Sequence, residues 1–395
     1  MNLQVPPAMG LYIHIPFCLR KCVYCDFNSF PVVPGAAERY VRALFADISR
    51  ARDMIGGGPR PSTLYIGGGT PTILPAGELA EIVSACAGAF GLESGAEVTV
   101  ECNPGTADYR SLRRLREAGV NRLSIGAQAL DDTLLQGLGR IHTSDDVRAC
   151  VRDARLAGFA NINLDLMFGI PHQTVRRWAE TLERVVGLDP QHISIYPLEV
   201  EEGTPLEESV SRGDVVLPTE DDVLAMWDAA METLETAGYS RYEISNYSRP
   251  GYESAHNLIY WRNGEYLGLG AGACSHYGRR RYYNARLPLD FCLAVEEGRS
   301  PVSETIPPAE APEGVAMAME MTETAIMGLR LADGLSLQGF QERFGRCLRG
   351  VFPGVIEDLA ASGLVSESGG SVRLTRRGLF VANAVFREFV SPVVS

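Results

Sequence analysis

The sequence predicts an α/β protein: a partial (β/α)6 TIM-like barrel followed by a C-terminal winged-helix-like α+β domain. Short apolar runs rich in Ile, Val, Leu and Tyr alternate with amphipathic stretches over residues 10–235, and several of these stretches stop at a glycine. The last 80 residues or so have a different pattern, with several helices before a short strand pair. Strand, helix, glycine stop and next strand make up the βα unit of a parallel sheet.

Six such units are present, whereas a closed eight-unit barrel needs about 250 residues, so we expect a partial, open barrel. An open doubly wound sheet is the alternative. It is disfavoured because the first βα turn carries cysteines in place of a glycine fingerprint. The predicted strands are residues 10–17, 63–66, 97–101, 122–125, 161–167 and 192–196.

Three of the intervening stretches have clear helical signals. Residues 111–118, 145–157 and 174–186 are amphipathic, and each is followed by a glycine. Thr143 and Ser144 are N-cap candidates for the second of these helices. These signals favour helices that cover the predicted sheet.

The remainder of the chain divides into two parts. Residues 240–300 are rich in Tyr, Asn, Arg and Gly and show few helical signals, and a Pro/Ala/Glu-rich linker covers about 300–314. We therefore predict three parts, 1–235, 236–314 and 315–395. The last part should hold helices at 317–329, 336–344 and 354–362, a strand pair near 364–374 and a final helix at about 376–389.

Composition excludes several classes of protein. The 395 residues carry a net charge of −13, which argues against nucleic acid or an anionic membrane as the main partner. The second helix of the winged-helix pattern carries Glu357 and Asp358 and no basic residue, which argues against base reading. No signal peptide or membrane span is recognisable, so we expect a cytoplasmic protein. Lys21 is the only lysine, which argues against a Schiff-base or phosphate-loop lysine.

Three cysteines lie together directly after the first predicted strand. Cys18, Cys22 and Cys25 form a C-x3-C-x2-C pattern. Three thiolates on one loop can hold an iron–sulfur cluster and leave one iron open to an exchangeable ligand. A structural zinc site needs four protein ligands, and the nearest other cysteine is the distant Cys86. The pattern therefore favours an iron–sulfur cluster over zinc.

Polar residues and glycines follow the other predicted strands. Because parallel strands end at the same rim, we expect these residues to meet there. Any one of these residues, taken alone, is explained more simply as a helix cap or turn residue. For Asp165, an ion pair with Arg140 is a further alternative. The residues are Gly68, Gly69, Thr70, Glu101, Gln128, Arg140 and Asp165.

The cysteine spacing on a first βα loop resembles the radical S-adenosylmethionine (SAM) superfamily. That resemblance implies a [4Fe–4S] cluster on Cys18, Cys22 and Cys25, with the amino and carboxylate groups of SAM on the open iron. It also implies that one electron from the cluster cleaves SAM to a deoxyadenosyl radical. The positions that match SAM contacts in this superfamily are Tyr12, Tyr24, Gly68, Gly69, Thr70, Glu101, Gln128, Arg140 and Asp165.

Residues 12–18, 126–128 and 139–142, with the C-terminal part, look like the oxygen-independent coproporphyrinogen III oxidase group. The oxidase branch has a further cysteine two positions after the third. This chain has Phe27 there, as HemW-type haem chaperones do. The segment from His256 to Trp261 (HNxxYW) resembles a signature linked to haem binding in that branch. The resemblance thus implies His256 as a haem ligand, with Cys274 and His276 as alternatives.

The resemblance implies a haem chaperone that carries a [4Fe–4S] cluster, SAM and haem and transfers haem to an acceptor protein. Its expected partners are that acceptor, which can be membrane-bound and contacted transiently, and an electron donor such as a flavodoxin or ferredoxin. Coproporphyrinogen III oxidation is the first alternative, and Phe27 counts against it. Another radical SAM reaction, such as methyl transfer, is the second, and the HNxxYW segment counts against that one.

Overall fold

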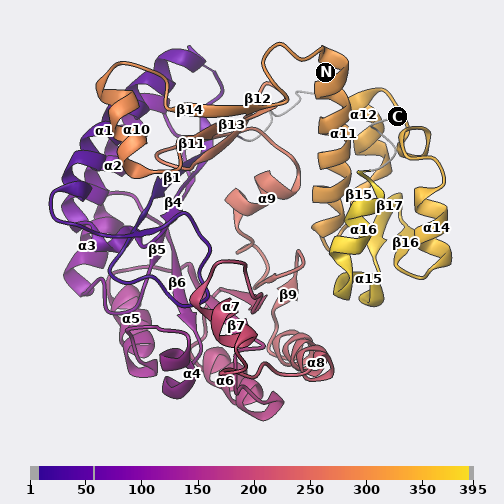
Figure 1. Ribbon diagram of the computed structural model, residues 1–395, viewed down its shortest axis with the longest axis horizontal. Coiled ribbons are helices and arrows are strands. Elements are labelled where there is room, and N and C mark those ends of the chain that lie inside the picture. The colour runs from indigo at the N-terminus through magenta and orange to yellow at the C-terminus, as the bar shows by residue number, and fades with distance from the viewer. Residues whose placement is uncertain (1–8, 57, 391–395) are drawn as a thin grey trace.

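The computed structural model describes residues 9–56 and 58–390. A curved, twelve-stranded sheet includes most of the strands. Their order across the sheet is β14-β13-β12-β11-β1-β4-β5-β6-β7-β8-β10-β9. The C-terminal elements lie opposite its inner side, as Figure 1 shows in yellow. None of the helices described is both long and apolar enough to cross a bilayer.

The six predicted strands are confirmed, and they occupy the centre of the sheet in chain order. Each pairs in parallel with the next, so their carboxyl ends form one rim. Along each strand, buried apolar residues alternate with polar ones, such as Thr99 on β5, Ser124 on β6 and Asn163 on β7. One face of the sheet is therefore apolar and the other is partly polar. The strands are β1 (Met9–Ile15), β4 (Pro61–Gly68), β5 (Glu97–Cys102), β6 (Arg122–Gln128), β7 (Ile162–Phe168) and β8 (His192–Pro197).

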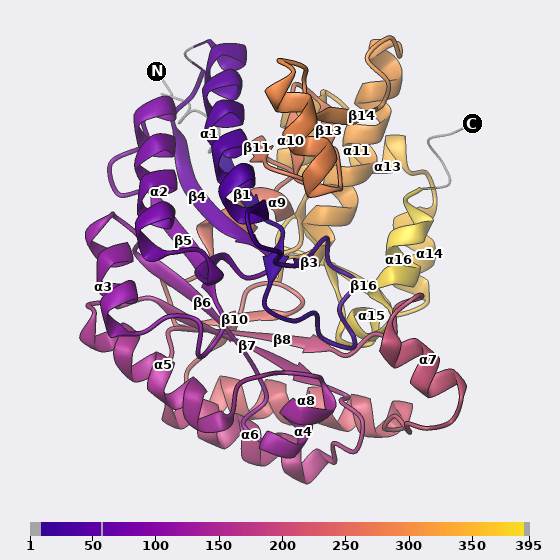
Figure 2. The same ribbon diagram turned by 60° about the vertical axis from the view of Figure 1, so that its left-hand side comes forward.

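Helices cover the outer side of this sheet (Figure 2). The three predicted helices are present, and Thr143 caps the second through a capping box with Asp146. The outer helices are α1 (Ala36–Ile55), α2 (Ala76–Phe90), α3 (Tyr109–Glu117), α5 (Ser144–Leu156), α6 (Val175–Gly187) and α8 (Glu220–Thr236). Shorter elements in the loops are β2 (Phe17–Cys18), β3 (Phe30–Pro31), η1 (Pro71–Ile73), α4 (Asp132–Gly137) and α7 (Pro205–Ser211).

The sheet does not stop at residue 235, where the first predicted part ends. Strand β11 (Tyr266–Leu269) pairs in parallel with β1, on the side away from β4, and antiparallel strands extend both edges. The backbone at Cys274 approaches β11 so closely that a Cβ on residue 268 would lie 2.0 Å from the Cys274 carbonyl oxygen. Position 268 of this glycine-rich strand therefore has to be glycine. The added elements are β9 (Ser240–Arg241), β10 (Asn246–Ser248), α9 (Ala255–Trp261), β12 (Cys274–Tyr277), β13 (Arg280–Asn284), α10 (Pro288–Glu296) and β14 (Val302–Ile306).

Two expectations therefore need correction. The predicted linker at about 300–314 contains β14, and two helices lie in a segment expected to have few. The sequence signal failed here because these short elements are stabilised by tertiary partners: β14 pairs with β13, α9 packs on β4 and α11 (Glu313–Arg330), and α10 packs on α1. The division into three parts remains a prediction.

The C-terminal domain has the predicted winged-helix-like order and its own apolar core. Its strands form a separate sheet in the order β15-β17-β16. The predicted final helix at 376–389 is wrong as a single helix, because Val381 leaves the helical region (φ −119°, ψ 29°) and divides it in two. The elements are α11 (Glu313–Arg330), β15 (Leu335–Ser336), α12 (Leu337–Phe344), α13 (Leu348–Val351), α14 (Val355–Ala361), β16 (Val365–Ser368), β17 (Ser371–Leu374), α15 (Arg376–Phe380) and α16 (Ala382–Glu388).

Candidate functional site

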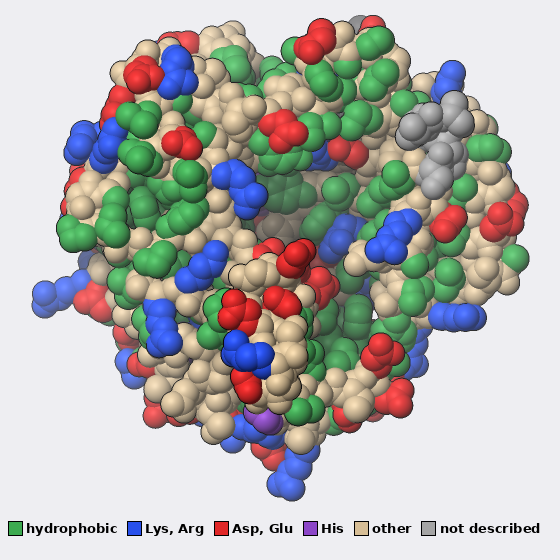
Figure 3. Space-filling model, viewed as in Figure 1, with side chains coloured by type: hydrophobic (Ala, Val, Ile, Leu, Met, Phe, Trp, Pro, Cys, Tyr) green, Lys and Arg blue, Asp and Glu red, His purple; other side chains and the backbone are tan. Residues whose placement is uncertain are grey.

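A cavity of about 800 Å³ lies at the carboxyl ends of the parallel strands and is bounded by the C-terminal domain. Figure 3 shows the molecule hollowed between these two halves, with apolar side chains inside the hollow. The volume is near the upper end of the range for small-molecule sites. Eleven of the thirteen predicted site residues line it: Cys18, Cys22, Tyr24, Cys25, Gly68, Gly69, Thr70, Glu101, Gln128, Arg140 and Asp165.

The cysteine loop lies on one wall of this cavity, between the paired strands β2 and β3. The Thr70 hydroxyl donates to Cys18 Sγ (3.5 Å), and Arg140 Nη1 donates to Cys22 Sγ (3.6 Å). The three thiols are free of disulfides. Within residues 9–56 and 58–390, however, no three His, Cys, Asp or Glu side chains form a group that could hold a metal ion. The three thiols thus lie on one wall, and each has its own hydrogen-bonding neighbour: Thr70, Arg140 and Ser29.

The glycines after β4 are required by close backbone packing. A Cβ on Gly69 would lie 2.5 Å from the Phe17 carbonyl oxygen, and one on Gly68 would lie 2.6 Å from the ring of His14. Gly68 also has a φ of 116°, which side chains rarely adopt. Its amide donates to Glu101 Oε2 (3.1 Å). This tight turn brings the end of β4 against the cysteine loop.

Two half-buried carboxyl groups face the cavity from β5 and β7. Glu101 accepts a hydrogen bond from the Tyr65 hydroxyl (2.8 Å), yet burial raises the pKa of Glu101 to about 7. Asp165 accepts from Asn163 Nδ2 (2.8 Å) and from the Ser124 hydroxyl (3.0 Å), and burial raises its pKa as well. Burial thus favours the neutral form of both groups, and a cation beside either of them would favour the carboxylate.

Arg140 does not pair with Asp165, so that alternative is wrong. Its Nη2 donates to Asn103 Oδ1 (2.7 Å) and to the Gly126 carbonyl (2.8 Å). Gln128, at the end of β6, has a φ of 63° that turns the chain at the rim. Most of the donors of Arg140 are thus used within the wall.

Tyr12 and His256 are the two predicted site residues that do not line the cavity. The hydroxyl of Tyr12 is hydrogen-bonded to His14 Nδ1 (2.9 Å). His256, on α9, is 1% exposed, and its Nδ1 and Nε2 are hydrogen-bonded to Thr63 Oγ1 and to the Tyr260 hydroxyl, both at 2.7 Å. Burial lowers the pKa of His256 to about 3.

The predicted role of His256 as a haem ligand therefore disagrees with its placement. Neither ring nitrogen is free, and the imidazole stacks on Tyr65 with ring centroids 5.1 Å apart. The alternatives Cys274 and His276 do not line the cavity either, and His276 Nδ1 bonds to the Gly264 carbonyl oxygen (2.9 Å). The HNxxYW motif could not predict this burial, because Thr63 and Tyr65 lie almost 200 residues away in the chain.

Sequence reasoning missed the opposite wall of the cavity. Trp227 from α8, Ile244, Arg330 from α11 and residues 379–384 of the C-terminal domain complete it. Trp227 meets Phe380 edge-on, with ring centroids 5.2 Å apart. These residues are far apart in the chain and carry no shared pattern, so no signal was available to find them.

Apolar side chains line this cavity while remaining exposed. Leu19, Phe27, Ile141 and Val381 are 56%, 65%, 57% and 42% exposed. They come from the cysteine loop, the loop after α4 and the C-terminal domain. Exposed apolar groups that line one cavity are typical of a ligand or partner site.

Two family models match the chain, the radical SAM superfamily over residues 12–185 and the HemN C-terminal domain over 319–381. The chain is 37% identical to the haem chaperone HemW of Bacillus subtilis, across 96% of this chain and 98% of that one. It is 32% identical to the haem chaperone HemW of Lactococcus lactis, across 98% of each. The solved structure of Escherichia coli coproporphyrinogen III oxidase (HemN) matches 98% of this chain and 90% of that one with a TM-score of 0.82. At 23% identity, this match shows the shared fold.

Proposed function

Because the chain belongs to the family of the haem chaperone HemW, within the radical SAM superfamily, we propose that it binds haem and transfers it to an acceptor protein. The observation that carries this proposal is similarity over almost the whole length of both chains. The cavity supports it, since it combines room for a large ligand with exposed apolar groups at Leu19, Phe27 and Ile141. His256 is not used as the axial ligand in this proposal, because both of its ring nitrogens are engaged.

The proposal includes a [4Fe–4S] cluster on Cys18, Cys22 and Cys25. Three free thiols on one cavity wall, two of which accept hydrogen bonds from Thr70 and Arg140, suit thiolate ligation of such a cluster. When bound, the cluster supplies a one-electron reductant beside SAM.

The chain's own residues would hold SAM on the same rim. The Gly68 and Gly69 backbone leaves room for close approach, and Arg140 braces the Cys22 side of the wall. Glu101 can accept hydrogen bonds or face a cationic group once its proton is lost.

The proposed partners are a haem-acceptor protein, free or membrane-bound, and an electron donor such as a flavodoxin or ferredoxin, with the cytoplasm as the location. The second candidate is oxidative decarboxylation of coproporphyrinogen III. The fold shared with the Escherichia coli oxidase favours it. Phe27 counts against it, because the oxidase branch has a cysteine at that position.

Haem titration of the anaerobically reconstituted protein tests the proposal. We expect saturation at one haem per chain, and we expect coproporphyrinogen III to stay unchanged when SAM and a reductant are present. A Cys18→Ser/Cys22→Ser/Cys25→Ser variant, which removes the cluster thiols, separates haem binding from the cluster. Absence of specific haem binding together with turnover of coproporphyrinogen III would reverse the choice between the two functions.

A further inference from the structure

Arg330 lies on the cavity wall with hydrogen-bonding capacity that the protein does not use. It is the last residue of α11, and its side chain is 25% exposed. Its Nε is buried without a hydrogen-bond partner in the described part of the chain. Its Nη2 lies 3.6 Å from Glu243 Oε2, which is within ion-pair range but longer than a hydrogen bond. A guanidinium has five N–H donors, and the two Nη atoms of Arg330 make no hydrogen bond within the described residues, so they retain donors for a ligand in the cavity.

The guanidinium is nevertheless held in a defined position. Its Cζ lies 4.3 Å from the ring centroid of Trp261, the last residue of the HNxxYW segment. Glu243 is fully buried and is fixed through its other oxygen, which accepts from the Ser245 amide (2.8 Å) and from Asn246 Nδ2 (2.5 Å). One face of Arg330 is thus supported by an aromatic ring, and one side by a carboxylate.

Other arginines of the chain use their donors differently. Arg140 donates to Asn103, Gly126 and Cys22 within the cavity wall. Arg281 forms a bidentate pair with Glu323. Unlike Arg140 and Arg281, Arg330 has donors free to bind a planar anion. A carboxylate fits best, because its two oxygens match the paired N–H donors of a guanidinium.

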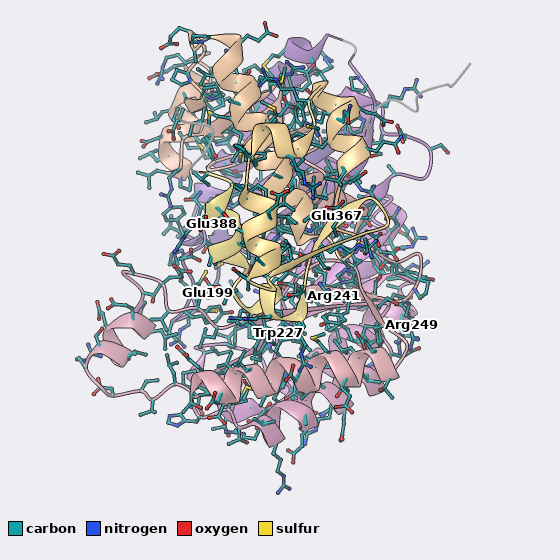
Figure 4. The ribbon with its side chains drawn as sticks, turned by 90° about the vertical axis from the view of Figure 1, so that its right-hand side faces the viewer. Glu199, Trp227, Arg241, Arg249, Glu367 and Glu388 are labelled. Atoms are coloured by element: carbon teal, nitrogen blue, oxygen red, sulfur yellow. The ribbon has the colours of Figure 1, made fainter. Side chains whose placement is uncertain are left out.

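The cavity that Arg330 lines also has an aromatic corner, in which the rings meet edge-on. Trp227, Phe168 and Phe380 line the same cavity, and the Trp227 ring lies 6.1 Å from Phe168 and 5.2 Å from Phe380. Figure 4 shows Trp227 where α8 meets the C-terminal domain. A ligand that uses both features has an apolar body, which can lie against one ring and meet the other at its edge, and a peripheral carboxylate. A porphyrin with propionate side chains has both features.

We propose that Arg330, stacked on Trp261, binds a propionate carboxylate of haem whose ring lies against Trp227 and Phe380. This inference rests on the proposed haem-binding function and assigns its carboxylate-recognition site. It gives Trp261 of the HNxxYW segment a positioning role, as the support of the guanidinium. The carboxylate of SAM is the other source of this chemistry, and the experiment distinguishes the two.

The test compares haem with haem dimethyl ester, in which both propionates are esterified. We expect wild-type protein to bind haem roughly 10- to 100-fold more tightly than the diester, as for loss of a hydrogen-bonded charge. The Arg330→Gln variant should bind haem and the diester about equally, and its affinity for haem should be roughly 10- to 100-fold lower than that of wild type. Arg176→Gln is the matched control, because Arg176 is 88% exposed on α6. SAM affinity should be equal in all three proteins.

Each contrary outcome has a defined meaning. Equal binding of haem and its diester by wild-type protein overturns the Arg330 assignment and leaves the haem chaperone intact, and this comparison needs no folded variant. Loss of SAM affinity in Arg330→Gln with haem affinity unchanged also overturns it, in favour of the SAM carboxylate. No binding of either porphyrin by any of the proteins is the distinct failure of the proposed function itself.

Discussion

At the scale of single residues, His256 shows how a motif residue can act away from the ligand. Its two hydrogen bonds and its stacking on Tyr65 place it behind the cavity wall. Tyr65 in turn donates to Glu101, which does line the cavity. His256 therefore supports Glu101 through Tyr65, and its imidazole must be neutral to do so, since burial lowers its pKa to about 3.

Replacing His256 by Gln should lower the free energy of unfolding by about 1–3 kcal/mol at pH 7.5, the usual loss for a disrupted buried polar network. The difference from wild type should shrink as pH falls from 6.5 toward 4. The unfolded imidazole takes up a proton below pH 6.5 and the folded one does not until about pH 3, so wild type alone loses this stability on acidification. Urea unfolding at several pH values measures the difference, with the exposed His172→Asn as control. A difference that stays constant with pH contradicts the prediction.

Glu101 leads to a second prediction at this scale. Its pKa of about 7 means that the carboxyl is partly protonated at neutral pH. If it faces a cationic part of SAM, binding favours the carboxylate, so SAM affinity should rise as pH increases from 6 to 8. Glu101→Gln should remove this dependence. Calorimetric titration across that pH range checks it, and an equal slope in both proteins would rule out Glu101 as the linked group.

At the scale of elements, the end of β4 links the sheet to the cysteine loop. Gly69 leaves room for the Phe17 carbonyl oxygen of β2, the strand that ends at Cys18. The Gly69 and Thr70 amides donate to the carbonyls of Ile15 and Phe17, both at 2.8 Å. The glycine motif thus has a packing role in positioning the first cysteine, whatever it contacts in a ligand.

Gly69→Ala should displace β2, because its Cβ would lie 2.5 Å from a backbone oxygen that cannot move freely. We expect a loss of about 1–3 kcal/mol in unfolding free energy and less iron per chain after reconstitution. Gly88→Ala on α2 is the matched control, since nothing lies within 4 Å of its added methyl group. Iron analysis and thermal unfolding of both variants are the measurements. Wild-type iron content in Gly69→Ala would show that the turn does not position Cys18.

At the scale of the whole molecule, the C-terminal domain completes the cavity that the barrel begins. Phe380 packs on Trp227 of α8, and Arg376 pairs with Asp228 of the same helix. Residues 379–384 belong to the loop and helix ends produced by the break at Val381. The division of the predicted last helix therefore directs part of this domain into the cavity.

Phe380→Ala should weaken haem binding by roughly 3- to 10-fold, the equivalent of one aromatic pair, and leave the secondary structure unchanged. Phe344→Ala is the matched control, because Phe344 is also half-buried in this domain but does not line the cavity. Haem titration with circular dichroism on both variants tests it. Equal affinities in the two variants would mean that the C-terminal domain closes the cavity without contacting the ligand.

The sequence by itself determined the parts whose signals are local. Apolar runs predicted the six central strands, glycines and caps bounded the helices, and the C-x3-C-x2-C spacing singled out the loop that lies on the cavity wall. Such features depend on periodicity and turn chemistry within about 20 residues of chain. For the same reason, the residues at the ends of successive strands could be expected at one rim.

Only the tertiary structure decided which distant segments share a surface. It placed β11 beside β1, buried His256 against Thr63, and brought Arg330, Trp227 and Phe380 to one wall. Each arrangement depends on contacts between residues tens to hundreds of positions apart, and their stability comes from burial and pairing with those partners. The sequence around a short strand, a histidine or an arginine does not show which distant residues will pack against it. The role of such an element or residue is therefore decided by the tertiary structure.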